Sequence, residues 1–222
     1  AGVPLHIGFN RRFDPSHKAV ADAVAHGAVG DVAIVNITSR DPAPPPISYI
    51  EVSGGIFNDM TIHDFDMARY VTGSEVETVF AVGAVRVDPA IGDAGDVDTA
   101  VVVLTHENGA ITTIDNSRQA VYGYDQRVEV FGSGGVAISE NPLSTTTVYR
   151  NADGGRQATV PYFFLDRYVP SYIAEWEAFR DMVRTGAASP VSMADGRAPL
   201  ALGIAASRSA REGRIVAVHE VA

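Results

Sequence analysis

The sequence predicts an α+β fold in which helices cover one face of a large, mostly antiparallel open sheet. Two observations predict it. From residue 75 to residue 160, β-branched segments are separated by short turns rich in glycine and asparagine, as in hairpin-connected strands. Helical patterns stand before and after this region and do not alternate with its strands, which argues against a doubly wound sheet. The second face of the sheet is then either solvated or used in an interface.

The first part of the chain combines short elements. Residues 5–9 alternate enough to predict a short strand, and residues 15–25 are expected to form a helix that begins at a proline. Residues 31–39 carry alternating β-branched side chains and are expected to form a strand. A proline-rich loop over residues 40–46 follows, because proline cannot continue a ladder. The next segment is expected to be a helix closed by Gly73.

The middle of the chain is expected to form strands. An Asn-Gly pair, the strongest short hairpin signal, joins two of them. The expected strands are residues 76–87, 99–105, 110–116, 127–131, 136–139, 145–150 and 156–160. Successive strands joined by short turns predict an antiparallel meander.

Two helices and a short strand finish the chain. In the first helix, apolar residues recur every three or four positions from Ile173 to Val183, with Pro170 near its start. The second helix is rich in alanine and begins near Asp195. The last strand is expected over residues 215–218.

Composition excludes several classes of function. Hydrophobic residues make up 46% of the 222 residues and charged residues 20%, which is ordinary for a soluble protein with a real core. The net charge of −10 argues against general affinity for nucleic acid or anionic membrane. We find no apolar run of membrane-spanning length and no signal peptide.

The numbers of cysteine and lysine residues restrict the catalytic mechanisms that this chain could support. The chain has no cysteine, which excludes thiol nucleophiles and cysteine-ligated metals and favours a reducing cytoplasm. Lys18 is the only lysine, so a mechanism that needs another lysine must obtain it from elsewhere. The chain begins at Ala1 without an initiator methionine, and we expect it to be part of a longer protein.

The most informative segment is residues 54–66. It places Asp59, His63 and Asp66 at i, i+4 and i+7, positions that share one face of a single helix. A carboxylate one turn before an imidazole can orient it, and a second carboxylate can hold a polar ligand. The spacing therefore predicts an acid/base site, and two preceding glycines would let a ligand approach the backbone.

Two alternatives stay open for this segment. One is an amphipathic helix whose polar face simply meets solvent. The other is a metal site with Asp59, His63 and Asp66 as ligands, which we rank lower because only one of them is a nitrogen donor.

Two further segments carry candidate ligand-binding groups. Asn10, Arg11 and Arg12 follow the first expected strand, and arginines at a strand end can hold phosphates or carboxylates, or form a solvated turn. Tyr122 and Tyr124 alternate and would share a face of a strand, where phenols suit a polyhydroxylated ligand or stabilise a sheet edge.

These three segments together resemble the C-terminal part of the Gfo/Idh/MocA family of nicotinamide-dependent oxidoreductases. They are residues 8–14, residues 54–66 with the pattern Gly-Gly-x-x-x-Asp-x-x-x-His-Asp, and residues 122–125 followed by a strand. The resemblance covers essentially the whole chain. The Tyr-Gly-Tyr-Asp sequence and Asp66 favour the inositol branch of the family, less specifically.

The resemblance implies a two-part protein. Residues 1–13 would contain the last strand of a dinucleotide-binding Rossmann domain, and residues 14–222 would form the substrate-binding and oligomerisation domain. NAD or NADP would be bound mainly by the N-terminal domain. That domain and a catalytic lysine with it would be absent, since no G-x-G-x-x-G turn follows a strand in this chain and Lys18 lacks the family's Glu-Lys-Pro context.

The resemblance also implies a role for each matching residue. His63 would be the general base that takes the hydroxyl proton of the substrate, and Asp59 would orient it or bind a neighbouring hydroxyl. Other ring hydroxyls would be held by Asp66, Tyr124 and Tyr122, with Asn10 at the border of the cleft. Arg11 or Arg12 would approach the cofactor.

The implied activity is the NAD-dependent oxidation of myo-inositol to its 2-keto form, with no metal. The alternatives are a dehydrogenase of another sugar or polyol of the same family, a non-catalytic binding or assembly module, and a metal-dependent isomerase or hydrolase that uses Asp59 and His63. We also expect a homodimer or homotetramer formed through the bare face of the sheet.

Overall fold

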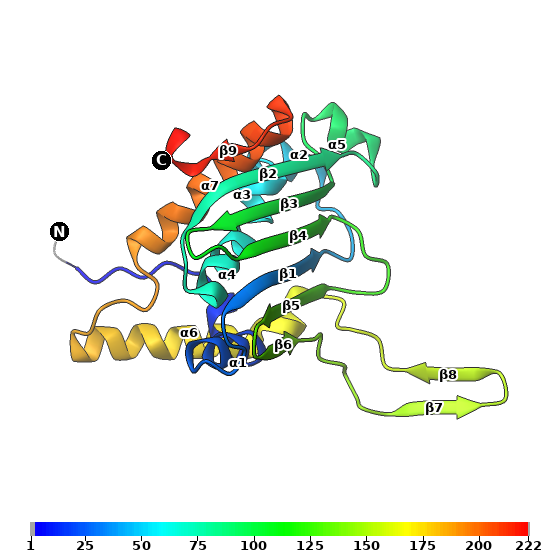
Figure 1. Ribbon diagram of the computed structural model, residues 1–222. Helices are drawn as coiled ribbons and strands as arrows, with labels where there is room; N and C mark the ends of the chain where they lie inside the picture. Colours follow the sequence, from blue (N-terminus) through cyan, green and yellow to red (C-terminus); the bar gives the residue numbers. More distant parts are fainter. Residues whose placement is uncertain (1–2, 222) are drawn as a thin grey trace.

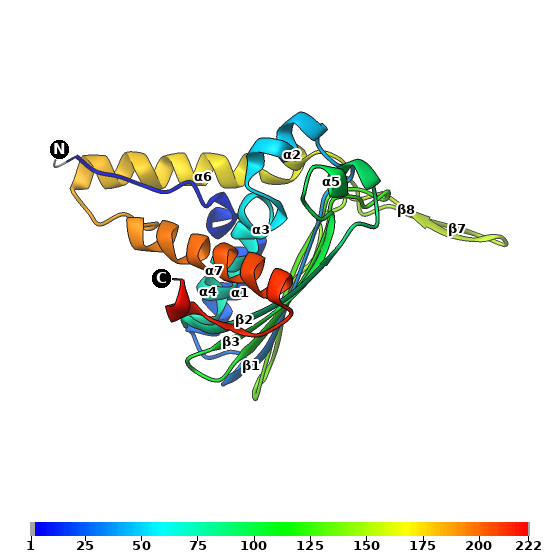
Figure 2. The same ribbon diagram turned by 90° about the horizontal axis from the view of Figure 1, so that it is seen from above.

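A computed structural model describes residues 3–221 as one sheet with helices packed on one of its faces (Figures 1 and 2). The helices are η1 (Asn10–Phe13), α1 (Pro15–Ala25), α2 (Ile47–Ser53), α3 (Ile56–Asp59), α4 (Ile62–Thr72), α5 (Pro89–Asp93), α6 (Phe164–Thr185), α7 (Met193–Glu212) and η2 (Val218–Glu220). The strands are β1 (Val32–Arg40), β2 (Val76–Ala84), β3 (Thr99–His106), β4 (Ile111–Ser117), β5 (Asp125–Gly132), β6 (Gly135–Ser139), β7 (Val148–Asn151), β8 (Gly154–Gln157) and β9 (Val216–Ala217). The predicted α+β class is confirmed.

The sheet is not the simple meander that the sequence predicts. Its strand order is β6-β5-β1-β4-β3-β2-β9, so β1 lies between β5 and β4. β1 runs parallel to β4, and the other neighbouring strands of this sheet pair antiparallel. A parallel pair needs a long crossover, and the helices α2 to α4 belong to the chain that connects β1 to the rest of the sheet.

The hydrophobic core lies between the helices and the inner face of the sheet. Alternate residues of each central strand point into it, as the burial of Val35 and Ile37 on β1 and Val102 and Leu104 on β3 shows. Phe65 of α4 is fully buried in the same cluster. The helices therefore cover the inner face of the sheet.

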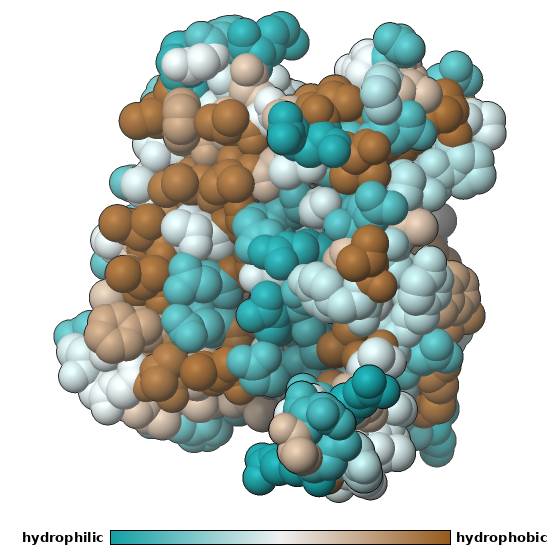
Figure 3. Space-filling view, turned by 90° about the vertical axis from the view of Figure 1, so that its right-hand side faces the viewer, coloured by the Kyte–Doolittle hydropathy of each residue, from teal (hydrophilic) through white to brown (hydrophobic). Residues whose placement is uncertain are grey.

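The opposite face, which we call the free face, is uncovered and largely apolar. Its exposed apolar side chains come from β1 to β6: Ile34, Phe80, Val82, Val101, Ile111, Phe131, Val136 and Ile138. Figure 3 shows hydrophobic surface along the left side of the molecule, where this face lies. Isolated exposed apolar residues are normal, but a contiguous set of this kind marks a contact surface.

The N-terminal segment differs from the prediction. Among the described residues no strand pairs with residues 5–9, so their extended backbone forms no ladder. The segment is held instead by a hydrogen bond from Ile7 N to the carbonyl of Val191, 3.1 Å long, and continues into η1.

The long helix α6 also differs from the prediction. It begins at Phe164, so Pro170 lies inside the helix instead of near its start. The apolar residues that recur at helical spacing are mostly exposed: Ile173 by 56%, Trp176 by 69% and Val183 by 50%. The periodicity therefore identified a real helix but not a face buried in this domain. None of the helices over residues 3–221 combines the length and the apolar character needed to cross a membrane.

The strands β7 and β8 form a separate two-stranded sheet. The sequence predicts this hairpin, but places it in the meander. Figure 1 shows it projecting well away from the main sheet. We call residues 142–160, which contain it, the arm.

Candidate active site

One cavity of about 520 Å³ gathers most of the predicted site residues. Because β1 and β4 are parallel, their carboxyl ends reach the same edge of the sheet and place Asp41 and Arg118 there together. The start of α6 and the segment α2 to α4 supply the other walls. The lining residues are Asn10, Arg11, Asp41, Pro42, Ala43, Pro45, Tyr49, Asp59, Met60, His63, Arg118, Tyr124, Tyr162, Phe163, Phe164, Tyr168 and Tyr172. The volume suits a small polar molecule.

The motif of residues 54–66 does not form the single helix that the sequence predicts. The α3 helix ends at Asp59, and α4 begins at Ile62. At the break, the Thr61 N–H donates to the carbonyl of Ile56, five residues back, and the Thr61 hydroxyl donates to Asn116 on β4 at 2.6 Å. A threonine hydroxyl that bonds outside its helix competes with the helical pattern. Asp59, His63 and Asp66 therefore do not share one helix face.

The glycine pair before α3 has a backbone role. Gly54 and Gly55 have φ values of 88° and 84°, in the region that favours glycine. They turn the chain so that the Ile56 N–H donates to a carboxylate oxygen of Asp96 at 3.0 Å. A Cβ on Gly55 would lie 3.1 Å from that carboxylate, so the close approach is to Asp96 and not to a ligand.

His63 is the one histidine among the described residues that line the cavity. Neither ring nitrogen hydrogen-bonds to another described residue, and Nδ1 is buried without a partner. The ring packs edge-on against Phe9, with centroids 5.9 Å apart. Burial, and then the positive charge of Arg11, lower the pKa of His63 to about 3. The imidazole is therefore neutral at physiological pH, which is the form that can accept a proton.

Asp59 lines the cavity but is not bonded to His63. Its carboxylate accepts hydrogen bonds from the Tyr49 hydroxyl at 2.5 Å and from Arg118 Nη1 at 3.1 Å. Arg118 is buried and also contacts Asp96 at 3.4 Å. Asp59 is thus fixed by α2 and by the end of β4, and can offer its carboxylate to a ligand beside the imidazole.

Arg11 lies at the base of the cavity and is tied to the fold. Its guanidinium donates to Asp64, the residue after His63, and to the Ser39 hydroxyl of β1 at 3.3 Å. Asn116 of β4 donates to the other oxygen of Asp64 at 2.9 Å. This buried network fixes the start of α4 against the sheet and places a positive charge next to His63.

Arg12 and Asp66 are not among the residues that line the cavity, and they are bonded to each other instead. Arg12 donates two hydrogen bonds to the buried carboxylate of Asp66, at 2.9 Å and 2.6 Å, and a third to Asp195 at 3.0 Å. Its guanidinium also lies over the ring of Tyr70, 5.2 Å from the centroid. The pair joins η1, α4 and the start of α7, so the Asp66 carboxylate is engaged by Arg12 although Asp66 and His63 lie on the same helix.

The two tyrosines of the Tyr-Gly-Tyr-Asp sequence lie in different environments, and only Tyr124 lines the cavity. Tyr124 is buried, lines the cavity and packs edge-on against Tyr168 at 5.9 Å. Tyr122 is 48% exposed and its hydroxyl pairs with Asp125 and Arg40 outside the cavity. The reason is local, since β5 begins only at Asp125 and Gly123 turns the chain with a φ of 131°. The strand alternation that the prediction assumed does not exist here.

Several residues that line the cavity were not identified from the sequence. Asp41 has no hydrogen-bond partner for its carboxylate among the described residues, and burial raises its pKa to about 6. Its backbone N–H donates to the Ser117 carbonyl at 2.9 Å and its carbonyl accepts from Ala120, so its position is fixed on both sides. Its place directly after a strand and before the proline-rich loop is a signal that could have found it.

Tyr168 was also missed. It is buried on α6, its hydroxyl has no partner, and burial raises its pKa. With Tyr124 and Tyr172 it adds three phenol rings to the lining of the cavity that contains His63. Only the tertiary structure brings α6 to this place, so no local pattern marks these residues as cavity residues.

The arrangement can accept a proton and hold hydroxyl groups. His63 offers an unengaged imidazole nitrogen, and Asp41, Asp59, Asn10 and the phenols offer hydrogen-bond partners around it. Lys18 does not take part, because it lies on α1 in an exposed ion pair with Asp22. Within residues 3–221 no cluster of three or more histidine or carboxylate groups could hold a metal ion.

The fold is that of the GFO/IDH/MocA C-terminal domain. The model of that family matches residues 17–138, and the chain belongs to the family. The resemblance predicted from the three motifs is confirmed.

Individual relatives agree with this assignment. The chain is 56% identical, over 221 residues, to a myo-inositol 2-dehydrogenase of Thermotoga maritima, covering 100% of this chain and 66% of the relative. It superposes on the crystal structure of a probable dehydrogenase from Thermotoga maritima with a TM-score of 0.98 at 55% identity, covering 99% of this chain and 66% of that one. A scyllo-inositol dehydrogenase from Lactobacillus casei, solved with NAD(H) and scyllo-inositol, gives a TM-score of 0.89 at 26% identity, covering 98% and 65%. The chain thus spans just under two thirds of the length of the relatives that it matches.

Proposed function

We propose that the protein containing this chain is an NAD-dependent inositol 2-dehydrogenase, which oxidises myo-inositol to 2-keto-myo-inositol. The observation that carries the proposal is the neutral His63, with an unengaged nitrogen, in a cavity walled by phenols and carboxylates. The similarity to inositol dehydrogenases over the whole chain supports the same substrate class.

The residues of the cavity have different roles toward the substrate. The proton of the reacting hydroxyl passes to His63, which is neutral before the step and positively charged after it. NAD, when bound, would supply the hydride acceptor for the same carbon, so that loss of the C–H and O–H hydrogens leaves a ketone. Asp41, Asp59 and Tyr124 hold the other ring hydroxyls, and Asn10, fixed by its bond to Ser171 at 3.1 Å, borders them.

The described residues could contact only the part of the cofactor that exchanges hydride with the substrate. Within residues 3–221 no glycine-rich turn between a strand and a helix is present to hold a pyrophosphate. The two arginines of the cavity are engaged, Arg11 by Asp64 and Arg118 by Asp59 and Asp96. We infer that an N-terminal dinucleotide-binding domain, which would end within residues 1–13, holds most of NAD or NADP. That domain also supplies the lysine that stabilises charge on the substrate oxygen.

A dehydrogenase of another polyol is the second candidate. The relative solved with scyllo-inositol shows that the family accepts more than one inositol isomer. The groups that would discriminate between isomers are those that hold the non-reacting hydroxyls, chiefly Asp41, Asp59 and Tyr124.

The test is an assay of the complete protein with NAD or NADP and a panel of polyols, followed by NADH or NADPH absorbance. We expect turnover of myo-inositol that is lost in His63→Ala. Good turnover of a sugar with none of any inositol would refute the substrate, and no turnover of any polyol would favour a non-catalytic module.

We further propose that the free face pairs with the free face of a second copy, giving a homodimer or a homotetramer. Its exposed apolar residues supply the contact area. We infer a cytoplasmic location, where the NAD pool is available to the reaction. Light scattering during size exclusion tests the assembly, and Val101→Asp, at a position 51% exposed on this face, should yield monomers.

A further inference from the structure

The arm is attached to the body only at its two ends. At the first end, Asn141 bonds to the backbone N–H of Gln126 at 2.8 Å and donates to Asp125. At the second end, the Pro161 carbonyl accepts from the Tyr124 N–H at 2.8 Å. Between these anchors, the hydrogen bonds of the described arm residues are all internal to the arm.

An arm of this kind is not stabilised by its own contacts. A two-stranded hairpin alone is marginally stable in water, and both of its edges offer unpaired backbone groups. Every residue of β7 and β8 is exposed, including Val148 by 48% and Tyr149 by 61%. With roughly ten residues from base to tip, at about 3.3 Å per residue, the arm reaches about 30 Å beyond the body. It therefore needs a surface outside its own subunit.

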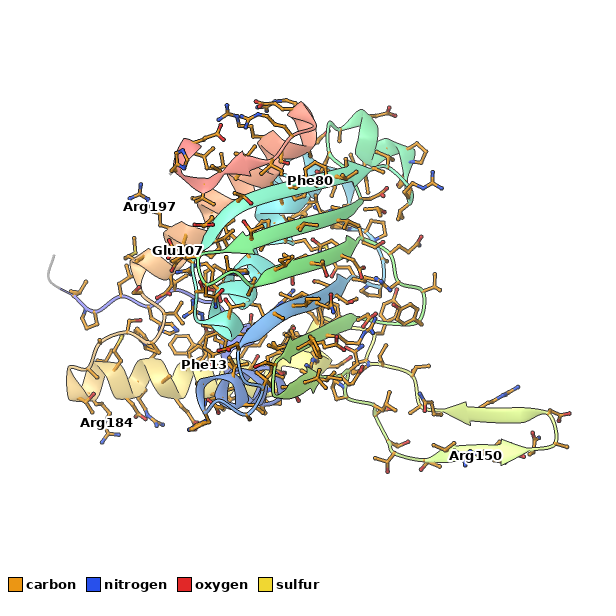
Figure 4. The ribbon with its side chains drawn as sticks, in the orientation of Figure 1. Phe13, Phe80, Glu107, Arg150, Arg184 and Arg197 are labelled. Atoms are coloured by element: carbon orange, nitrogen blue, oxygen red, sulfur yellow. The ribbon has the colours of Figure 1, made fainter. Side chains whose placement is uncertain are left out.

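The arm and the free face lie on the same side of the molecule. Figure 2 shows the helices on one side of the sheet and the arm projecting on the other. In Figure 4, Phe80 lies on the main sheet, and Arg150 lies far out on β7. A molecule that covers the free face therefore meets the arm as well.

The charge of the arm and the symmetry of protein assemblies indicate which molecule the arm contacts. The arm carries Arg150 and Arg156 against a single carboxylate, Asp153, whereas the whole chain has a net charge of −10. The basic arm is thus complementary to the acidic body of another copy of the same chain. In a two-fold arrangement each arm lies on the other subunit, and both contacts form at once.

We propose that the arm is a clasp that packs on a second copy of this chain, the copy that docks on the free face. The inference rests on the assembly given above under the proposed function, but assigns it a second contact surface. The chain leaves the arm directly into Tyr162, Phe163 and Phe164 in the cavity wall, so the clasp also steadies one wall of the site.

The experiment compares the complete protein with two matched double variants. Tyr149→Ser with Arg156→Ser removes the side chains of one cross-strand pair of the arm. Val183→Ser with Arg184→Ser removes an exposed apolar and an exposed basic side chain of α6, on the helical side of the sheet. Sedimentation measures the dissociation constant of each assembly. Hydrogen exchange of the β7 and β8 amides is followed over a dilution series.

We expect the arm variant to weaken assembly by about tenfold or more, with the control unchanged. We also expect arm amides that are protected in the assembly and lose protection on dilution. An unchanged dissociation constant with freely exchanging arm amides would overturn the clasp and leave the free-face assembly standing. A monomer at every concentration would overturn both. Arm amides that stay protected after dilution has dissociated the assembly would overturn the clasp alone. Turnover of inositol by the wild type, measured separately, reports on the proposed activity alone.

Discussion

Replacing His63 by glutamine should change how stability depends on pH. Burial and the charge of Arg11 lower the pKa of His63 to about 3, whereas the unfolded chain has the ordinary value near 6.5. Between these two pH values the unfolded state binds a proton that the folded state does not. The wild type therefore has its full stability from this group above pH 6.5 and loses it progressively as the pH falls towards 3.

The magnitude follows from the same two pKa values. Each pH unit inside the window changes the free energy of unfolding by about 1.4 kcal/mol, which gives about 2 kcal/mol between pH 7 and pH 5. The glutamine variant lacks this dependence. On going from pH 7 to pH 5, the difference in unfolding free energy should shift in its favour by about 2 kcal/mol.

The assay is urea denaturation of wild type and variant at both pH values, with the same substitution at the exposed His26 as control. A difference between wild type and variant that stays constant within about 0.5 kcal/mol would refute the neutral imidazole. An NMR titration provides a direct check, because the ring protons of His63 should not shift until the pH falls well below 5.

Three further substitutions test separate parts of the site. In the complete enzyme, His63→Ala should lower kcat by about 10²- to 10⁴-fold, and steady-state kinetics with a near-normal kcat would remove His63 from the mechanism. For the wild type, KM for the polyol should fall as the pH rises through about 6, where the Asp41 carboxyl ionises, and Asp41→Asn should abolish this trend. A wild-type KM that is flat over this range would argue against hydroxyl binding by Asp41. Asp66→Asn should cost about 3 kcal/mol in urea denaturation, because it breaks a buried pair with Arg12, with KM unchanged. A raised KM with normal stability would contradict the position of Asp66 outside the cavity.

The sequence predicted the candidate site well where chemistry is local. His63, Asp59, Asn10, Arg11 and Tyr124 all line the cavity, as the motifs suggested. Their residue types and the glycines near them are visible in the sequence, and the motif that contains two of them is specific. Their individual roles in turnover remain predictions until the variants are assayed.

The sequence failed where a side chain's direction depends on a neighbouring element. Asp66 follows His63 by three residues on α4, yet its buried carboxylate bonds to Arg12 of η1 and does not line the cavity. Tyr122 fits a strand alternation, yet Gly123 turns the chain before β5 begins. In the first case a partner from a distant part of the chain engages the side chain, and in the second a glycine interrupts the assumed strand period.

In the sheet, too, local pairings were predicted from the sequence and a long-range pairing was not. The hairpins β3–β4 and β5–β6 follow from turn residues close in sequence and were predicted. The parallel pairing of β1 with β4 joins segments far apart in the chain, and no local signal specifies it. That pairing matters for function, because it brings the carboxyl ends of both strands, and with them Asp41 and Arg118, to one cavity.

The sequence by itself determined the fold class, most helices and strands, the family and the histidine on which the proposed chemistry depends. These follow from short-range rules of periodicity, turn chemistry and motif spacing, which act over a few residues. Only the tertiary structure decided which polar residues face the cavity, that His63 is neutral, and that the arm stands on the side of the free face. Those properties depend on burial, on charges brought close by distant elements and on long-range strand pairing, none of which is encoded in local sequence.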